Sequence, residues 1–389
     1  MNKKIDLVEL AQQFIRFRSV TPNDDGLLEY IISLLKNYGF NIIEKTFGDG
    51  LYQVKNLYAE LKSSNDRALN VCFAGHVDVV PEGDINLWKH HPFSGIVDDN
   101  ILYGRGAVDM KGAIAAYIAV VLNNIQDFSK HLTLSFLLTS DEEGIAEDGT
   151  KKMLEFITNQ GYKIDYTILG EPTSSSKVGD MIKIGRRGSA NFILDIFGKQ
   201  GHPAYPHLAD NALHKMSNIL SSLTKYQFDN GTSYFDPTNL QITNLEVHNA
   251  STSLIPGHVS AKFNIRFNDM YTLDNLHTTV KSIVEQCTRN FELKYHSNAE
   301  PFIVKNNKMI NAFKLGIKEI NLKEPSITTT GGTSDARFIH KYSKTLECGL
   351  LSSTAHQINE CVNVEDLHKL HSIYLKSIRY FIKDCGLGT

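Results

Sequence analysis

Hydrophobic positions in the first half of the chain alternate between continuous apolar runs and helical spacing. The apolar runs are flanked by polar residues and have the length of buried strands. Alternation of strands and helices predicts an α/β fold, with helices covering the faces of a sheet. The pattern predicts helices near 5–17, 25–37 and 114–122, and strands at 69–74, 133–139 and 166–169.

The pattern changes after about residue 186. Residues 189–197 and 259–267 alternate apolar and polar side chains, as in a half-solvated antiparallel sheet, and 209–224 between them predict a helix. Helical spacing returns at 307–320 and 364–381. A chain of 389 residues exceeds the usual size of a single core. We therefore expect a discontinuous first domain, 1–186 with 300–389, and an inserted smaller α+β domain, 187–299.

Composition narrows the class of protein. Hydrophobic residues make up 42% and charged residues 21%, as in a globular enzyme, and the net charge of -3 favours neither a nucleic-acid partner nor an anionic membrane surface. No apolar run has the length of a membrane-spanning helix or of a secretory signal. The five cysteines are scattered, which suits a reducing compartment. We expect a cytoplasmic protein without a nucleic-acid or membrane partner.

Polar side chains follow the ends of the predicted strands. His76 and Asp78 come after the first strand, Glu171 comes after the third, and Asp109 precedes the helix near 114. Ligands of open α/β sheets lie at the carboxyl ends of the strands, so these side chains are expected to share one edge. Taken singly, each has a structural reading as well: an exposed histidine, a helix-start aspartate, or the turn at Glu171-Pro172.

Three adjacent carboxylates, Asp141, Glu142 and Glu143, follow the second strand. Neighbouring carboxylates repel one another and are costly to bury, so this triplet is either a solvated loop or is neutralised by a cation. Histidine with several carboxylates suits zinc, with cobalt or manganese as alternatives, and two ions could share one carboxylate. Adjacent Glu142 and Glu143 diverge, so one could bind metal while the other acts as general base. Asp78 could orient the His76 imidazole.

At these residues the sequence resembles a known superfamily, the di-zinc amidohydrolases that include aminoacylases, acetylornithine deacetylases and dipeptidases. The shared motifs are GHVDVVPEG (75–83), LYGRGAVDMKG (102–112), TSDEEG (139–144) and GEPT (170–173). Longer segments resemble the branch that cleaves succinyl amides: IKIGRRGSANF (182–192), GKQGHPAYPHLADNALHK (198–215), TTTGGTSDARFI (328–339) and STAHQINECVNVEDL (353–367). The resemblance covers nearly the whole chain.

The resemblance implies two zinc ions per subunit, for which cobalt could substitute. It places His76 and Glu171 on one ion, Glu143 and His356 on the other, and Asp109 between them. Glu142 becomes the general base and Asp78 the partner of His76. The inserted domain becomes a dimerisation or lid domain, and His202 reaches the active site of the partner in a homodimer to stabilise an oxyanion.

The resemblance also implies hydrolysis of N-succinyl-LL-2,6-diaminopimelate to succinate and LL-2,6-diaminopimelate. The expected substrate-binding residues are Arg187, Ser189, Tyr205, Arg266, Gly332 and Thr333. Arginine pairs well with the carboxylates of such a substrate. Ser253 and Ser352 replace asparagines that are usual in this branch, and 247–250 also departs from its pattern. A related N-deacylase, for example one acting on acetylornithine, is the alternative; a non-catalytic relative would lack Glu142 or a ligand, and a serine hydrolase would need a motif that is absent.

Overall fold

The computed structural model describes residues 4–249, 251–305 and 307–386. The chain divides into two compact units. Unit 1 comprises Met1–Ile184, Val304–Thr328 and Ser334–Thr389, and unit 2 comprises Gly185–Ile303 and Thr329–Thr333. The predicted insertion, 187–299, omits the short segment Thr329–Thr333, which belongs to unit 2. One reason is a hydrogen bond from the Arg186 guanidinium to the carbonyl of Gly332, at 3.0 Å.

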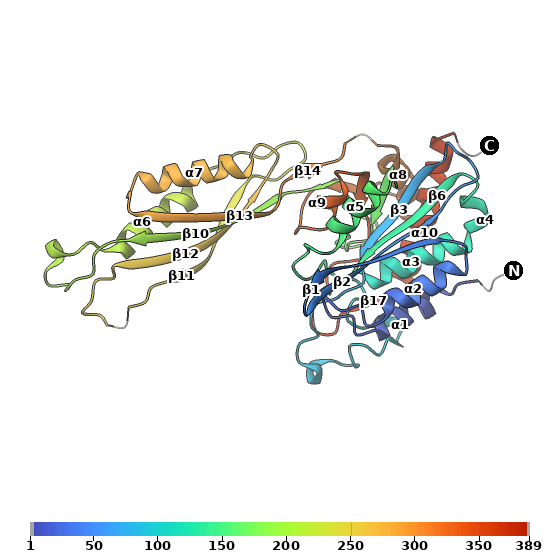
Figure 1. The fold of residues 1–389 in the computed structure, drawn as a ribbon, viewed down its shortest axis with the longest axis horizontal. Coiled ribbons are helices and arrows are strands. Elements are labelled where there is room, and N and C mark those ends of the chain that lie inside the picture. The colour runs from blue at the N-terminus through green and yellow to red at the C-terminus, as the bar shows by residue number, and fades with distance from the viewer. Residues whose placement is uncertain (1–3, 250, 306, 387–389) are drawn as a thin grey trace. The chain divides into compact units, whose positions relative to one another are not determined.

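The described part of unit 1 contains a mixed sheet in the order β1-β2-β6-β3-β7-β16-β8-β15. Figure 1 labels its strands β1, β2, β3 and β6. β3 runs parallel to both β6 and β7, whereas β1 and β2 are antiparallel. The register pairs His76 with Thr139, so β3 and β6 end at the same edge. The α/β fold class is therefore confirmed. The strands are β1 (Asn41–Asp49), β2 (Tyr52–Leu61), β3 (Leu69–His76), β6 (Leu132–Thr139), β7 (Tyr166–Leu169), β8 (Met181–Lys183), β15 (Ser326–Thr328) and β16 (Lys344–Glu347).

The helix α3 (Lys111–Asn123) is buried along almost its whole length, between the sheet and the helices α1 and α10. Its Tyr117 ring stacks on Phe73 of β3 at 4.4 Å between centroids, and Tyr374 of α10 meets both rings edge-on. This aromatic cluster fixes the helix layer on the strand that carries His76. The other helices of unit 1 are α1 (Leu7–Arg16), α2 (Leu27–Lys36), α4 (Ile125–Phe128), α5 (Thr150–Asn159), α8 (Lys308–Asn321), α9 (Ala336–Ile339) and α10 (Val364–Asp384), with a short 3-10 helix η1 (Ile85–Leu87).

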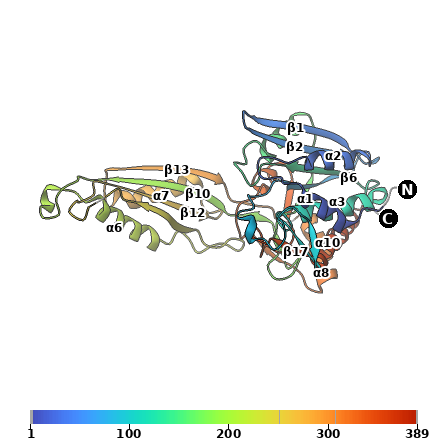
Figure 2. The same ribbon diagram turned by 90° about the horizontal axis from the view of Figure 1, so that it is seen from below.

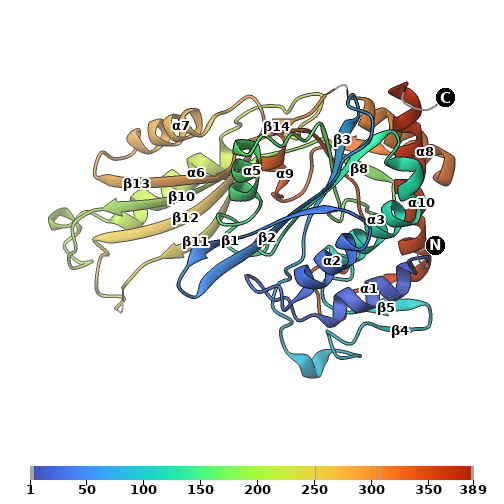
Figure 3. The same cartoon turned by 45° about the vertical axis from the view of Figure 1, so that its right-hand side comes forward.

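A small second sheet of unit 1 joins distant parts of the chain, in the order β17-β5-β4. Its strands β4 and β5 are labelled in Figure 3. It consists of β4 (Ile96–Asp98), β5 (Ile101–Tyr103) and β17 (Cys361–Asn363). Antiparallel pairing of Cys361 with Tyr103 brings the segment before Asp109 beside the segment after His356. None of the helices within the described residues is long and apolar enough to span a membrane.

Unit 2 has an antiparallel sheet in the order β11-β12-β10-β13, with α6 and α7 packed on one face (Figure 2). The strands alternate buried and open positions because only one face meets the helices. Phe192 and Phe263 stack in this core at 5.2 Å. The elements are β9 (Gly185–Arg186), β10 (Gly188–Phe197), η2 (Pro206–Leu208), α6 (Ala212–Lys225), β11 (Asn239–Glu246), β12 (His258–Phe267), α7 (Leu273–Glu285), β13 (Phe291–Ala299) and β14 (Phe302–Ile303).

Candidate metal centre

Three neighbouring parallel strands of unit 1 end at one edge of the sheet, and acidic or histidine side chains lie at each end. β3 ends at His76, β6 leads into Glu142 and Glu143, and β7 leads into Glu171. The ligand atoms of His76, Glu142 and Glu171 all lie within 4.8 Å of one another, as do those of His76, Asp109 and Glu143. The predicted convergence at the strand ends is therefore present in the structure.

Asp109 lies between two histidines. Its Oδ1 is 3.2 Å from His76 Nε2, and its Oδ2 is 3.1 Å from His356 Nε2. His356 Nε2 also lies 2.8 Å from Glu143 Oε1, and His76 Nε2 lies 3.8 Å from Glu171 Oε1. The two carboxylate oxygens of Asp109 thus face two separate groups of ligand atoms, the arrangement that a bridging carboxylate requires.

Asp78 orders both His76 and the acidic turn, through different atoms. His76 Nδ1 is 2.9 Å from the backbone carbonyl of Asp78, whereas the Asp78 carboxylate lies 3.7 Å from it. A carbonyl can only accept, so Nδ1 carries a proton, and Nε2 is the nitrogen that can bind a cation once its own proton is lost. The carboxylate instead accepts the backbone N–H groups of Glu142 and Glu143, at 3.3 and 3.0 Å.

Asp141, for which the sequence suggests no role, is fully buried. It accepts a hydrogen bond from the Tyr52 hydroxyl at 2.6 Å and another from the backbone N–H of Asp148 at 3.2 Å. The Tyr52 oxygen in turn accepts the N–H of Ile145 at 2.9 Å. The triplet is therefore not a solvated loop: its first carboxylate anchors the turn, and the next two point to the candidate centre.

The crowding of carboxylates shifts the pKa of each group. Burial and the negative charge of Glu171 raise the pKa of the Glu142 carboxyl well above its usual range. Burial raises the pKa of Asp78 to about 6. Although burial lowers it, the hydrogen bond with Asp109 and the charge of Glu171 raise the pKa of His76 well above its usual value. The contribution of Glu171 to the pKa values of both Glu142 and His76 reflects the negative charge that is gathered at this centre.

Hydrogen bonds with Asp109 and Glu143 raise the pKa of His356 to about 10. Although burial raises it, the hydrogen bonds with the two histidines hold the pKa of the Asp109 carboxyl below its usual range. Imidazole nitrogens and carboxylate oxygens, without thiolates, are a donor set that suits zinc and other borderline divalent ions. The residues present therefore fit two divalent cations that share Asp109, and the ions would offset the surplus charge.

The predicted substrate-binding residues lie in unit 2. Ser189 of β10 pairs directly with Arg266 of β12. Arg266 is half-buried, and burial followed by the positive charge of Arg187 lowers its pKa. Arg187 Nε is buried and has no hydrogen-bond partner within the described residues. Gly332 is exposed and Thr333 half-buried, next to each other in the segment that joins this unit.

His202 and Tyr205 lie on an exposed turn of unit 2, with ring centroids 5.6 Å apart. His202 Nδ1 accepts the backbone N–H of Ala204 at 3.0 Å. Because Nδ1 is the acceptor, a neutral ring carries its proton on Nε2, which can donate a hydrogen bond. Ser253 is exposed as well, and Ser352 donates from its backbone to the carbonyl of Ser174 at 3.1 Å.

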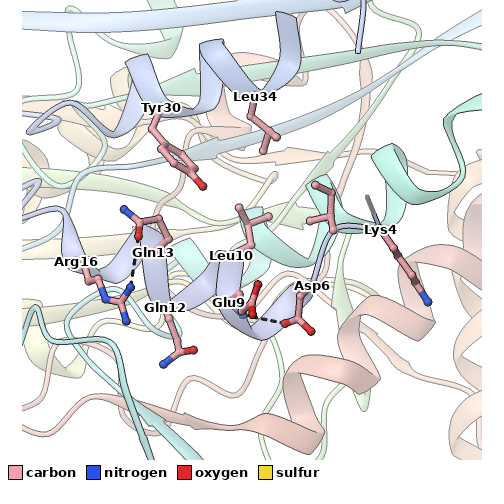
Figure 4. Close-up of a pocket in the computed structure, with 10 residues that line it drawn as sticks. Lys4, Asp6, Glu9, Leu10, Gln12, Gln13, Arg16, Tyr30 and Leu34 are labelled. Carbon is pink, nitrogen blue, oxygen red and sulfur yellow. Dashed lines mark hydrogen bonds between the residues drawn. The ribbon is translucent and has the colours of Figure 1, made fainter. Parts of the chain in front are cut away.

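A separate cavity of about 470 Å³ lies in unit 1 beside α1 and α2 (Figure 4). Gln12, Gln13 and Arg16 of α1 and Tyr30 of α2 contribute to its wall. None of the residues lining it is among those predicted for the metal centre, and it holds no comparable group of histidines and carboxylates. The strand-end centre is therefore the stronger candidate for chemistry within the described residues.

Sequence reasoning missed three residues that support the centre: Tyr52, Arg105 and Glu360. Glu360 is fully buried, pairs with Arg105 at 2.9 Å and accepts the backbone N–H of Asp109 at 3.2 Å. Arg105 and Glu360 stand inside motifs that carry the resemblance, but their types alone suggest ordinary surface charges. Tyr52 lies in a polar segment without a recognisable signal.

Comparison with known proteins identifies relatives over almost the whole length. The sequence profile of Peptidase family M20/M25/M40 matches residues 72–380. A succinyl-diaminopimelate desuccinylase of Orientia tsutsugamushi (strain Boryong) is 47% identical over 385 residues, which cover 98% of this chain and 97% of that protein. A protein of the same name from Ehrlichia canis is 45% identical, covering 97% of this chain and 98% of its own length.

Solved structures share the fold at lower identity. The aminopeptidase PepT of Bacillus cereus matches with a TM-score of 0.78 and 18% identity, covering 96% of this chain and 98% of its own. The YXEP protein of Bacillus subtilis, described as a dinuclear metal binding peptidase of the M20 family, matches with a TM-score of 0.69 and 15% identity, covering 96% of each chain. At these identities the likeness establishes the fold.

Proposed function

This chain belongs to Peptidase family M20/M25/M40, and we propose that it hydrolyses the amide of N-succinyl-LL-2,6-diaminopimelate to succinate and LL-2,6-diaminopimelate, in the cytoplasm. The name shared by relatives at 45 to 47% identity supports the substrate. The observation that best supports metal-dependent amide hydrolysis is the position of Asp109, with one oxygen facing His76 and the other facing His356.

His76, Glu171 and Asp109 would hold one divalent cation, and Asp109, Glu143 and His356 would hold the other. We propose zinc for both sites, with cobalt able to substitute, because the donors are imidazole and carboxylate. Two such ions, when bound, supply Lewis acidity that polarises the amide carbonyl and makes the attacking water more acidic. Asp78 keeps the His76 ring in the tautomer that ligation requires.

Glu142 is the proposed general base. Its carboxylate lies within 4.8 Å of the ligand atoms of His76 and Glu171. The hydrogen bond from its backbone N–H to the Asp78 carboxylate fixes the backbone from which this side chain extends. It takes the proton of the water that attacks the succinyl carbonyl. It then delivers a proton to the amine nitrogen as the C–N bond breaks. Succinate and the free amine of diaminopimelate are the products.

Arg187 and Arg266, with Ser189 directly opposite Arg266, are proposed to bind a carboxylate of the substrate. Gly332, Thr333 and Tyr205 are proposed to make further contacts with the substrate. Tyr205 lies on the turn of His202, beyond the opposite end of β10. Two neighbouring guanidiniums repel each other unless an anion lies between them, and a dicarboxylic acyl group supplies one. An acetyl group would not. Arg266→Ala should therefore raise KM for the succinyl substrate, and Lys262→Ala, at an exposed position of the same strand, is the matched control.

We further propose a homodimer, in which His202 of each subunit acts in the active site of the other. The exposed turn and the proton on His202 Nε2 support this role, because a donor with no hydrogen-bond partner among the described residues can bind an oxyanion. Unit 2 would then be the dimerisation and lid domain.

The direct test is hydrolysis of N-succinyl-LL-2,6-diaminopimelate by the zinc-loaded chain, followed by loss of amide absorbance. Turnover that a chelator abolishes and zinc restores is the expected result. N-Acetylornithine is assayed in parallel at equal concentration. Preference for acetylornithine would replace the proposed substrate by that of a related N-deacylase, and chelator-resistant turnover would remove the metal from the mechanism.

A further inference from the structure

Arg105 and Glu360 form a buried ion pair in unit 1. Arg105 is 2% exposed, Glu360 is fully buried, and their Nη1 and Oε2 atoms are 2.9 Å apart. A buried ion pair contributes little net stability compared with apolar side chains of similar volume, because both charges lose their hydration. The role of the pair is therefore indicated by the other groups to which Arg105 and Glu360 are hydrogen-bonded.

The second carboxylate oxygen of Glu360 faces the backbone before α3. It accepts the N–H of Val108 at 3.0 Å and the N–H of Asp109 at 3.2 Å. The backbone carbonyl of Glu360 also accepts the N–H of Gly104 at 2.9 Å. Glu360 thus holds the peptide that carries Asp109, although 251 positions separate the two residues in the chain.

Arg105 holds two other segments of the same centre. Its Nη1 donates to the carbonyl of Gln357, the residue after His356, at 3.0 Å. Its Nη2 donates to the carbonyl of Pro81 at 3.3 Å, shortly after His76 and Asp78, and its guanidinium lies 5.2 Å from the centre of the Trp88 ring. One guanidinium therefore spans the segments that follow both histidines.

His356 itself has a backbone φ of 61°, in the left-handed region that residues other than glycine seldom adopt. Such a conformation persists where the surrounding structure holds it. The bond from Arg105 to Gln357 acts on the very next residue. The position of the His356 ring relative to Asp109 thus depends on a contact outside the group of ligands.

We propose that the Arg105–Glu360 pair positions Asp109 and His356 relative to each other, so that both can bind the same cation. The pair does not touch the ion or the substrate, so these are positioning residues. This inference rests on the proposed metal centre and explains what holds its ligands in place. Loss of the pair should weaken the site of Asp109, Glu143 and His356 more than the site of His76 and Glu171.

The test separates positioning from stability by replacing both charges together. Arg105→Met with Glu360→Met removes the charges and keeps the side-chain volume, so no buried charge is left without a partner. Arg105→Met with Glu360→Gln keeps an amide oxygen that can accept the N–H groups of Val108 and Asp109. Glu60→Gln is the control, because Glu60 is another buried carboxyl of unit 1, bonded to Tyr58 and Asn70.

Two measurements are made on each protein. Zinc binding is titrated against a chromophoric chelator, and hydrogen exchange of the amides of Val108 and Asp109 is followed in the metal-free chain. We expect the Met/Met variant to bind the weaker of two ions about 10–100-fold less tightly. Its two amides should exchange at least about tenfold faster, since each has lost its acceptor. The Met/Gln variant should recover most of the amide protection, and Glu60→Gln should change neither quantity.

Wild-type binding of both ions and wild-type exchange in the Met/Met variant would overturn the inference. The inference would also be overturned if the losses of zinc affinity and amide protection simply scaled with the fall in melting temperature, and if Glu60→Gln showed the same relation. If the Met/Met variant does not fold, Arg105→Lys is used instead, because lysine keeps the charge but cannot reach Glu360 and Gln357 together. This variant must weaken cation binding only at the site of Asp109, Glu143 and His356. A wild-type chain that binds fewer than two ions would refute the proposed metal centre itself, a result distinct from these.

Discussion

The carboxylate of Asp78 accepts the backbone N–H of Glu143 at 3.0 Å, from the neighbouring strand end. It also accepts the N–H of Glu142, while the carbonyl of the same residue binds Nδ1 of His76. One fully buried residue thus sets both the tautomer of a histidine on β3 and the path of the acidic turn after β6. The sequence predicts that Asp78 orients the His76 imidazole, and in the structure the Asp78 carbonyl, 2.9 Å from Nδ1, is closer to the ring than the carboxylate at 3.7 Å.

Asp78→Asn should weaken metal binding and turnover by about 10–100-fold, as changes beside metal ligands commonly do. An amide has one acceptor oxygen, so its NH2 group would face the N–H of Glu142 or Glu143. Competition titration with zinc measures the effect. Asp84→Asn, at an exposed aspartate that caps η1, is the control. Equal affinity in the Asp78→Asn variant and the wild type would show that the turn needs no such acceptor.

Tyr52→Phe should destabilise unit 1 by roughly 1–3 kcal/mol, because the buried Asp141 carboxylate loses a charge-assisted hydrogen bond. The N–H of Ile145 loses its acceptor as well, so the turn that carries Glu142 becomes looser and turnover should fall. Urea unfolding and steady-state kinetics test both effects. Tyr162→Phe, which removes an exposed hydroxyl bonded to Asn41, should leave turnover unchanged. A Tyr52→Phe variant with wild-type kcat would contradict the anchoring role.

The strands that carry the centre could be predicted because they are continuous apolar runs. The regions 69–74, 133–139 and 166–169 correspond to β3, β6 and β7, and parallel neighbours must end at one edge. The hairpin of β1 and β2 was missed because β1 is mostly exposed and carries mixed polar residues. Its turn at Asp49-Gly50 is a hairpin signal that could have indicated it. α5 and α7 were missed as well.

The site could be predicted only in part. His76, Asp109 and the acidic triplet stand near strand and helix ends, where physical reasoning finds them. His356 lies in an irregular turn with no periodicity, and only the resemblance pointed to it. The contacts of Glu360 join segments far apart in the chain through a small sheet of three-residue strands, which sequence patterns do not reveal.

The proposed exchange of His202 between subunits predicts complementation between two inactive variants. Glu142→Gln lacks the base and His202→Ala lacks the oxyanion donor, but a mixed dimer has one complete site. Equal mixing with free exchange should restore about a quarter of the wild-type activity, since half of the dimers are mixed and each has one good site. Activity is measured after mixing and subunit exchange. No recovery in a verified mixed dimer would mean that His202 does not act in trans.

Asp229 should make the stability of unit 2 depend on acid pH. Although partial burial raises it, hydrogen bonds from Thr238, the N–H of Gly231 and Asn268 lower the pKa of Asp229. Because the folded pKa lies below the unfolded value of about 3.9, the stabilisation is present above that pH and is lost as pH falls through the folded pKa. Asp229→Ala should cost roughly 1–3 kcal/mol at pH 7.

Unfolding by urea at pH 7 and below about pH 4 measures this difference, which should shrink in acid as the wild-type carboxyl takes up its proton. Asp236→Ala, at an exposed side chain of the same loop, is the control and should show no such change. A cost of Asp229→Ala that stays constant with pH would mean that the carboxylate charge is not what stabilises the loop.

The central claim is that Glu142 transfers the proton at a centre of two divalent cations. Glu142→Gln tests it most directly, with metal content and hydrolysis of N-succinyl-LL-2,6-diaminopimelate measured on the same preparation. Glu147→Gln, at an exposed glutamate of the same turn, is the control. We predict two ions per chain in both variants, with kcat reduced by about 10²–10⁴-fold in the Glu142→Gln variant alone. A Glu142→Gln variant that holds two ions and turns over like the wild type would contradict the account.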